Sequence, residues 1–507
     1  MNPLRRRRHD GAQQPVPVSR PGSRGWAGHG AGPDLLIEPP DEWRGTTVQV
    51  CGMWPWIAGA GTPTIGVPFG QHMISGATVC CDPISWFRRA GLISNPSLFM
   101  LGLPGTGKTA AVMRLAVGMA GHGAIPLVLG DTRPDFVRMI RALDGQVIAI
   151  GRGRGSLNVL DPGQAPAAAT RLRAAGFHTE AAEVTANSHG IRVNMLRALI
   201  ALLRGTDPNV REMTILARAL TWLDTHHTGV PVIPDLLQVV RDAPAELRDA
   251  ALDRGDDTRY QEVTEDLEAA LMALSPGGPY GDIFARPTSE PMHTDQPVVF
   301  DVSGIPESET QLRAAALLAC WTQGFATVAI AQTLADVGLE PRRHHVVILD
   351  ELHQALTAGP GIVHRLDYLT RLNRTTAVAQ IMITHHPKDL QALADEADRT
   401  KAMGFIERAG IVVIGPLTPG DLHAQPGSDT RIRPLDSVVP MSNAEKQLVA
   451  SWSDPPSWDT DHTTTSTDQD SKGRFLIKLG GRPGIPVRVR LTNAEKQLHV
   501  SNTRWEH

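Results

Sequence analysis

Residues 97–120, SLFMLGLPGTGKTAAVMRLAVGMA, combine three local patterns that together decide the fold. The first five residues are a strand candidate, residues 102–109 are a glycine-rich loop, and the remainder is a helix candidate. Glycine allows the loop to curl so that its N–H groups point inward, and the helix adds its positive N-terminal end there. This is the context that a phosphate-binding GxxxxGK[ST] loop requires. The sequence therefore predicts a site for the polyphosphate of a nucleoside triphosphate.

Each residue of the loop has an expected part in this site. Lys108 is long enough to reach the β- and γ-phosphates, and the hydroxyl of Thr109 is expected to ligate magnesium. The residues expected to contact the nucleotide are Gly102, Leu103, Pro104, Gly105, Thr106, Gly107, Lys108, Thr109 and Ala110.

An enzyme with such a loop also needs a carboxylate at the end of a neighbouring strand. Three strand candidates end in acids: LVLGD at Asp131, VVFDV at Asp301, and VVILDE at Asp350 and Glu351. Only the last places two carboxylates side by side. We therefore assign Asp350 to the hydration shell of the metal and Glu351 to polarising the attacking water. For Asp131 and Asp301 the alternative is that they cap their strand ends.

Two later features stand where a phosphate sensor and an arginine finger belong. One strand candidate runs into Thr384 and His385, where a polar side chain would orient the water or read the γ-phosphate. A surface pair formed by His385 and His386 is the alternative. Arg371 and Arg374 precede that strand, and either would supply positive charge across a subunit boundary. A surface salt bridge is the alternative for both.

The hydrophobic runs of the chain indicate an α/β fold. Short apolar runs alternate with helical patterns, which is typical of a mainly parallel sheet with helices on its faces. The strand candidates are 97–101, 125–129, 146–150, 297–302, 345–349, 379–383 and 411–414. Residues 162–275 show helical periodicity and no clear strand, and predict an all-alpha insertion. Residues 474–479 and 485–490 flank GGRPG and predict a C-terminal β-hairpin.

The net charge and two stretches of unusual composition limit the kinds of partner. The 507 residues carry a net charge of −4, so any contact with nucleic acid needs a local patch. Residues 1–40 are rich in Arg, Gly and Pro and predict a disordered basic tail. This tail is either a solvated extension or an attachment to nucleic acid or anionic lipid. Residues 453–472 contain five aspartates and one lysine, and predict an acidic linker.

Three further patterns have structural explanations. Residues 314–335 lack charge, but threonine and glutamine dilute their hydrophobicity, so they predict a buried helix rather than a membrane span. The GRGRG segment at 151–155 predicts a turn. NAEKQL occurs at 443–448 and 493–498, each time after Ser or Thr, and predicts two capped helix starts.

The order of the motifs narrows the family. The loop is followed by LVLGDTRPDFVRMIRALDGQVIAIGRGRGSLNVLDP, the helical stretch, QPVVFDVSGIPES, VVILDELHQAL, RLNRTTAVAQIMITHHPKDL and GRFLIKLGGRPG. In this order the chain resembles the TraC-type motor ATPases of conjugative type IV secretion systems, in the FtsK/HerA branch of P-loop proteins. More narrowly, it resembles those of actinobacterial conjugation elements. The resemblance spans about residues 40 to 500 and rests mainly on motif order.

The resemblance implies a RecA-like P-loop NTPase core, ATP and Mg²⁺ as cofactors, and a homo-hexamer at a secretion channel. The implied partners are conjugation channel proteins and a relaxase–DNA complex, and the implied location is the cytoplasm, peripheral at the inner face of the cell membrane. In the family pattern residues 102–109 bind ATP, Asp350 supports magnesium and Glu351 activates water. Thr384 and His385 stand where the family usually carries Thr-Gln. Because only residues 41–96 precede the core, the channel-docking domain is expected to be absent or on another polypeptide.

The expected organisation is one motor with appendages. The parts are a tail (1–40), an N-terminal segment (41–96), the core (97–161 and 276–452), the insertion (162–275), the acidic linker (453–472) and a C-terminal hairpin and helix (473–507). The expected function is an ATP-hydrolysing motor that energises transfer of DNA or protein. Two alternatives stay open: a duplex DNA translocase or packaging motor with no secretion channel, and a nucleotide-dependent switch or scaffold with little turnover. The adjacent Asp350 and Glu351 argue against the switch.

Overall fold

One mainly parallel sheet carries the predicted site residues at one edge. A computed structural model describes residues 61–356, 363, 377–393, 395–424, 433–453 and 472–499. Within these residues the strands form an 11-stranded sheet in the order β2-β1-β11-β10-β9-β3-β8-β7-β4-β6-β5. The strands are β1 (Pro68–His72), β2 (Thr78–Cys80), β3 (Ser97–Leu101), β4 (Ala124–Asp131), β5 (Gln146–Ala149), β6 (Val298–Asp301), β7 (His344–Leu349), β8 (Val378–Ile383), β9 (Ile411–Ile414), β10 (Arg474–Lys478) and β11 (Ile485–Arg488).

The seven strands from β9 to β5 run parallel to one another. Every residue of β3, β4, β8 and β9 is buried, so both faces of the sheet are covered there. This explains why these strands appear in the sequence as continuous apolar runs. The predicted α/β fold with a mainly parallel sheet is confirmed. Because parallel strands end at the same edge, the loops after β3, β7 and β8 come together.

The remaining four strands extend the sheet in antiparallel fashion. The predicted hairpin is confirmed as β10 and β11, and β10 pairs with β9 inside the same sheet. β1 then pairs with β11, and β2 with β1. No strand was predicted at β1 or β2, because both segments are too short to show an alternating pattern.

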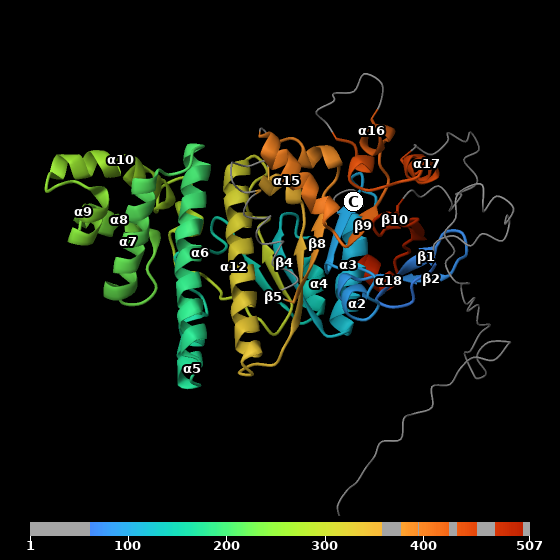
Figure 1. Cartoon of the computed structure of the whole chain (residues 1–507), viewed down its shortest axis with the longest axis horizontal. Helices are drawn as coiled ribbons and strands as arrows, with labels where there is room; N and C mark the ends of the chain where they lie inside the picture. The colour runs from blue at the N-terminus through green and yellow to red at the C-terminus, as the bar shows by residue number, and fades with distance from the viewer. Residues whose placement is uncertain are drawn as a thin grey trace, which may run out of the picture. The chain divides into compact units, whose positions relative to one another are not determined.

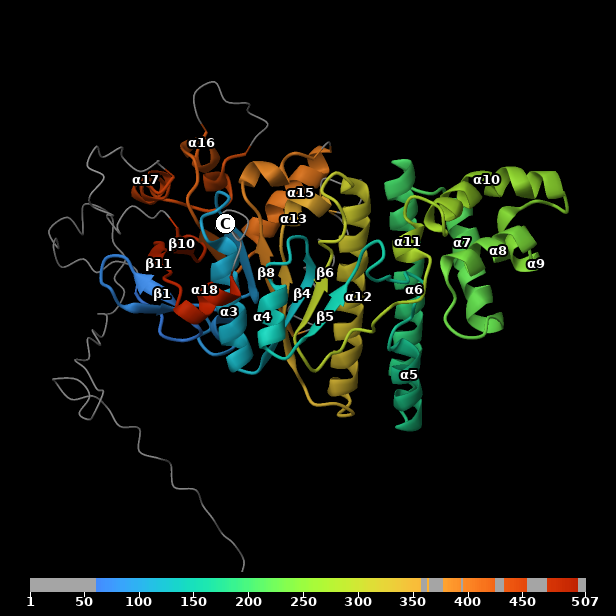
Figure 2. The same ribbon diagram turned by 180° about the vertical axis from the view of Figure 1, so that it is seen from behind.

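The helices fill the connections between the strands (Figures 1 and 2). They are α2 (Pro83–Arg88), α3 (Lys108–Gly121), α4 (Val137–Ala142), α5 (Ala165–Ala174), α6 (His178–Arg204), α7 (Val210–His226), α8 (Ile233–Asp242), α9 (Ala245–Ala251), α10 (Asp257–Leu274), α11 (Gly281–Phe284), α12 (Thr310–Asp336), α13 (Leu352–Leu356), α15 (Glu396–Glu407), α16 (Pro419–Leu422), α17 (Asn443–Ser451) and α18 (Asn493–Leu498), with short 3-10 helices η2 (Pro387–Leu390) and η3 (Leu435–Ser437). The phosphate-binding helix α3 and the long helix α12 both pack against β4.

The stretch between β5 and β6 is helical from α5 to α11 and contains no named strand. α6 packs on α12 and α7 packs on α6, so these helices continue outward from the sheet (Figure 1). Local capping helps to define them: Asn209 and Glu212 form a capping box at the start of α7. One continuous hydrophobic cluster joins the helices to the sheet, with Leu220 and Phe300 among its members.

α12 is the one helix in the described part of the chain that is long and apolar enough to cross a membrane. It lies between β4 and α6, and most of its residues are buried. The prediction of a buried helix at 314–335 is therefore confirmed. Its apolar surface is used for packing against the sheet and the helical stretch.

Two small sequence predictions are also confirmed. Gly151 and Gly155 pair across the GRGRG turn. Both NAEKQL copies begin helices with complete capping boxes, Ser442 with Glu445 and Thr492 with Glu495.

Some predictions concern residues that the structure does not describe. The basic tail (1–40), nearly all of the acidic linker and both finger candidates, Arg371 and Arg374, lie outside the described residues. Residues 62–507 group into one unit by their internal contacts and residues 1–61 into another.

Candidate functional site

The predicted phosphate-binding loop lies at the carboxyl end of β3, and α3 begins at Lys108. Gly105 and Gly107 have φ angles of 76° and 92°, a left-handed conformation that glycine adopts without strain. Gly107 is the N-cap of α3 and has no side chain to cap it, so the first N–H groups of the helix stay available for an anion. The loop therefore has the backbone shape of a phosphate cradle.

The Lys108 ammonium is folded back onto the loop. It donates to the carbonyls of Gly102 at 2.6 Å and Leu103 at 3.0 Å, and it lies 2.9 Å from Nδ1 of His385. Burial lowers the pKa of Lys108 to about 8, against the opposing effect of Glu351, Asp350 and Asp389. A polyanion in the loop would replace these contacts and favour the charged form of the lysine.

Asp350 and Glu351 follow β7 directly, as the sequence predicted. Burial, followed by the nearby charges of Glu351 and Asp131, raises the pKa of Asp350 to about 8. The N–H of Glu351 donates to Asp350 Oδ1 at 2.9 Å, and Glu351 itself has a φ of 50°. A glutamate in the left-handed region is uncommon and costs of order 1 kcal/mol. The strained residue lies at the point where both carboxylates line the cleft.

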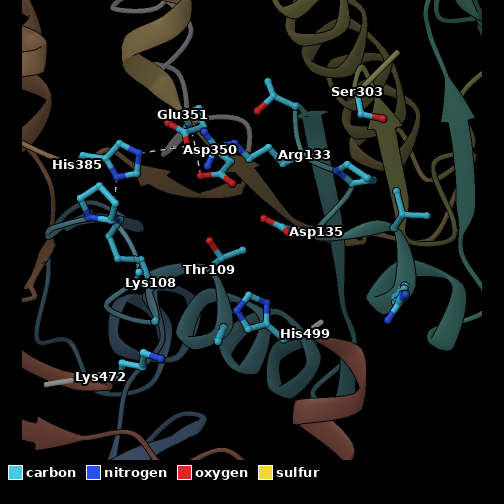
Figure 3. A pocket seen from close by; sticks show the side chains of 18 of the residues that line it. Lys108, Thr109, Arg133, Asp135, Ser303, Asp350, Glu351, His385, Lys472 and His499 are labelled. Atoms are coloured by element: carbon cyan, nitrogen blue, oxygen red, sulfur yellow. Dashed lines mark hydrogen bonds and ion pairs between the residues drawn. The ribbon is translucent and has the colours of Figure 1, made fainter. Parts of the chain in front are cut away.

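Two histidines flank the Glu351 carboxylate, and Figure 3 shows one of them, His385. Nε2 of His385 lies 3.2 Å from Oε1, and Nδ1 of His353 lies 3.4 Å from Oε2. Burial raises the pKa of Glu351, but the hydrogen bond and charge of His385, then the charges of His353 and Arg133, outweigh burial and lower it. The carboxylate is therefore held ionised. His385 connects Lys108 to Glu351, which rules out the surface-pair alternative for this residue.

His386 belongs to a different group of residues. Its Nδ1 lies 3.1 Å from Asp421, away from the loop. The preceding Thr384 is buried, and its hydroxyl has no hydrogen-bond partner among the described residues. Of the three polar residues after β8, His385 is thus the one that contacts the predicted catalytic groups.

Thr109 and Asp350 provide a suitable donor set for magnesium. Figure 3 shows Thr109 facing the cleft below Asp350, with Asp135 between them. No group of three acidic, histidine or cysteine residues in the described chain could hold a metal by itself. Mg²⁺ prefers one or two carboxylates, several waters and the substrate phosphates over an all-protein cage. The Asp350 carboxylate and the Thr109 hydroxyl are oxygen donors of the kind that such a site requires.

Asp131 and Asp301 follow the alternative considered for them, which is capping of their strand ends. The Asp131 carboxylate accepts from the backbone N–H groups of Asp135 and Phe136. Asp301 accepts from Ser303 and pairs with Arg154 of the GRGRG turn at 2.6 Å. Both acids cap their strand ends, and neither carboxylate is free for a metal.

The cleft around these groups has a volume of about 1730 Å³ and is predominantly basic. Its walls come from the loops after β3, β4, β6 and β7, and from the C-terminal segment. Gly473 donates to the carbonyl of Thr106, so the chain entering β10 touches the phosphate-binding loop. The cationic residues that line the cleft are Lys108, Arg133, Arg138, Arg141, Arg313, Lys472, Arg488, Arg490 and Lys496.

Several residues of this cleft were not predicted from the sequence. His353 follows Glu351 by two positions, and Asp135 and Arg133 lie in the DTRPD segment after β4. Each stands near a recognised motif, but no spacing rule marks it. Arg313 and the C-terminal lysines had no local signal, because only the packing of α12 and β10 brings them to the cleft.

The strand order, the loop and the paired carboxylates define a P-loop NTPase fold. The chain is similar to the solved structure of VirB4 from Thermoanaerobacter pseudethanolicus, with a TM-score of 0.59 and 18% sequence identity over 86% of this chain and 100% of that chain. No protein-family model and no curated protein matches the sequence. At this identity the likeness concerns the fold, and it confirms at that level the resemblance expected from motif order.

Two solved structures of the plasmid coupling protein TrwB also align with the chain. One, in complex with a non-hydrolysable GTP analogue, has a TM-score of 0.45 and 11% identity over 78% of this chain and 86% of that chain. The other, in complex with ADP and Mg²⁺, has a TM-score of 0.46 and 12% identity over 84% of this chain and 90% of that chain.

Proposed function

We propose that the protein is an ATP-hydrolysing motor that energises conjugative transfer or type IV secretion of DNA or protein. The observation that carries this proposal is the series of contacts from Lys108 through His385 to Glu351. It joins the phosphate-binding loop to the carboxylate expected to activate water. The motif order shared with conjugative motor ATPases and the VirB4-like fold support the choice among P-loop functions.

The residues have distinct tasks in this reaction. Lys108 exchanges its carbonyl and histidine partners for the β- and γ-phosphates. Thr109 and Asp350 would hold Mg²⁺, which would supply positive charge against the phosphates. Glu351, kept ionised, takes a proton from water as the water oxygen bonds to the γ-phosphorus. The bond from that phosphorus to the bridging oxygen breaks, and its electron pair stays on ADP.

The motor role adds a ring and a membrane-linked location to this chemistry. A homo-hexamer would place the cleft at a subunit boundary, where Arg371 or Arg374 of a neighbouring copy supplies positive charge. Channel proteins and a relaxase–DNA complex are the proposed partners, at the inner face of the cell membrane.

Lys108→Ala is expected to abolish ATP turnover, because the loop loses the cation that holds the terminal phosphates. Glu351→Gln is expected to bind ATP but to cleave it about 10²- to 10⁴-fold more slowly, since the amide cannot accept the proton. Phosphate release under multiple and single turnover measures both effects. Undiminished turnover in Lys108→Ala would refute the site.

The alternatives predict different results with the full chain. Stimulation of the ATPase by duplex DNA, with displacement of a bound triplex strand, would favour a translocase without a channel. ATP that stays bound and uncleaved by the wild-type protein would favour the switch or scaffold. Membrane co-purification with channel proteins, with and without residues 1–40, tests the secretion role.

A further inference from the structure

Arg313 is a buried cation in the wall of the nucleotide cleft that the proposed hydrolysis leaves without a task. It lies near the start of α12, and its side chain is 7% exposed. It donates to the carbonyl of Ile305 at 2.8 Å and to Gln354 at 3.3 Å, whereas its Nε is buried and has no hydrogen-bond partner in the described structure. Burial lowers the pKa of Arg313, because the guanidinium is poorly compensated for the water it has lost.

A second arginine, Arg133, lies near the same carboxylate as Arg313. Arg133 lies in the loop between β4 and α4, beside Asp350 and Glu351 in Figure 3. One carboxylate reaches both arginines: Glu307, from the loop between β6 and α12, lies 3.6 Å from Arg133 and 3.9 Å from Arg313. These distances exceed hydrogen-bond length, and Glu307 is 68% exposed. It is therefore a weak and readily displaced partner.

The arginine pair is electrostatically linked to the catalytic carboxylate. Burial raises the pKa of Glu351, and the charge of Arg133 is among those that lower it, after His385 and His353. Glu351 in turn favours the charged form of Arg313, against the larger effect of burial. In Figure 3, Lys108 and His385 lie on one side of Glu351 and Arg133 lies on the other. The cleft thus holds a second cationic centre on the side of Glu351 away from the P-loop lysine.

We propose that Arg133 and Arg313 form a binding subsite for inorganic phosphate after it leaves the γ position, and that Glu307 occupies this subsite between turnovers. A phosphate dianion has enough acceptor oxygens for both guanidinium groups. The inference rests on the proposed hydrolysis, which makes the phosphate. It assigns to these residues the retention and release of the product, a step that can limit the rate of a motor.

Titration calorimetry of the full-length protein, saturated with MgADP and titrated with inorganic phosphate, tests the subsite. Bound ADP occupies the P-loop, so added phosphate reports on the remaining cationic centre. Arg133→Gln and Arg313→Met are each expected to weaken phosphate binding at least about tenfold, because a charged hydrogen bond is lost. Glu307→Gln is expected to strengthen it several-fold, because the competing carboxylate is removed.

The matched control is Arg197→Gln on α6. It removes the same charge from the exposed ion pair that Arg197 forms with Asp207. Its phosphate affinity should equal that of the wild type, and ADP affinity should change by no more than about twofold in every variant. Arg133 and Glu307 are both exposed, so their variants should fold even if Arg313→Met does not. The subsite is refuted if wild-type protein with MgADP binds no phosphate, or if Arg133→Gln and Glu307→Gln leave the affinity unchanged. The titration needs no turnover, so absence of ATPase activity would refute the proposed function separately.

Discussion

His385 is the residue at which the site departs from the expected family pattern, and it also connects the two halves of the site. Its two ring nitrogens lie 2.9 Å from Lys108 and 3.2 Å from Glu351. A glutamine at this position has a donor and an acceptor on one short amide, whereas the imidazole places its two nitrogens on opposite sides of a ring. Histidine can therefore serve both partners without moving. The substitution preserves a link between nucleotide binding and the catalytic carboxylate.

His385→Ala is expected to lower kcat for ATP about 10- to 100-fold with little change in KM, because Glu351 loses a hydrogen bond while the P-loop stays intact. His385→Gln should recover part of this loss. Steady-state ATPase assays separate the two parameters. The neighbouring His386→Gln is the control, since His386 pairs with Asp421 outside the loop. Wild-type kcat in His385→Ala would show that the bridge plays no part in turnover.

The site residues that could be predicted from the sequence are those that lie within a recognisable local motif. The loop at 102–109 and the Asp350–Glu351 pair carry their strand context with them, and the structure brings them together. His353 and Arg313 have no such context. His353 enters the site at the start of α13, which begins directly after Glu351. Arg313 enters it because α12 packs against β4 and α13, and that packing is not visible in any local pattern.

At the scale of elements, the C-terminal segment is fastened to the phosphate-binding helix. Arg114 of α3 pairs with Glu495 of α18 at 2.6 Å and also donates to the carbonyls of Phe69 and Arg490. Hydrogen bonding by Arg114 is the main cause that lowers the pKa of Glu495 to about 2. One arginine thus connects α3 with β1, with α18 and with Arg490, which precedes α18. The helix that follows the phosphate-binding loop is therefore linked directly to α18 and to the residues after β11.

The Glu495 contact predicts acid-sensitive docking of α18. Because the pKa of Glu495 is lower in the folded protein than its ordinary value of 4.5, its stabilising effect is present above pH 4.5 and is lost as pH falls toward 2. Hydrogen exchange should therefore show α18 losing protection over that range before α3 does. In Glu495→Gln, exchange of α18 should already be faster at neutral pH and should lose this pH dependence. Glu183→Gln, at an exposed site on α6, is the control, and equal behaviour of both variants would contradict the tether.

Element boundaries followed the hydrophobic runs closely in the parallel core. β3 and β9 coincide with their predicted ranges, and the other predicted strands differ by a few residues. The antiparallel pair β1 and β2 was not predicted, since PFGQH and TVC are too short for an alternating pattern to be recognised. Pairing with β11, far along the chain, is what makes β1 a strand.

At the scale of the whole molecule, the helical stretch shares its core with the nucleotide-binding sheet. The hydrophobic cluster runs from Phe300 of β6 through Leu317 of α12 to Leu199 of α6 and Leu220 of α7. An insertion with its own core would unfold separately. A shared core couples the stability of the sheet to that of the helical stretch. It also connects the cleft to the outer helices through continuous side-chain packing.

Leu220→Ala tests this coupling. Leu220 is fully buried, and its truncation is expected to lower the free energy of unfolding by about 2–5 kcal/mol. Hydrogen exchange in denaturant should show α7 and β4 losing protection together. Val210→Ala at the 85% exposed start of α7 should change stability by less than about 0.5 kcal/mol. Loss of protection in α7 alone would indicate an independent helical domain.

The local sequence was sufficient for the phosphate-binding loop, the paired carboxylates and the parallel strands, because each is specified by residues a few positions apart. Motif order then predicted a fold that the VirB4 structure shares. The tertiary structure alone decided which of several polar residues become partners. His385 bridges Lys108 and Glu351, Arg313 and Arg133 both lie near Glu307, and the C-terminal segment forms one wall of the cleft. These contacts join residues far apart in the chain, so they depend on packing that no local pattern encodes.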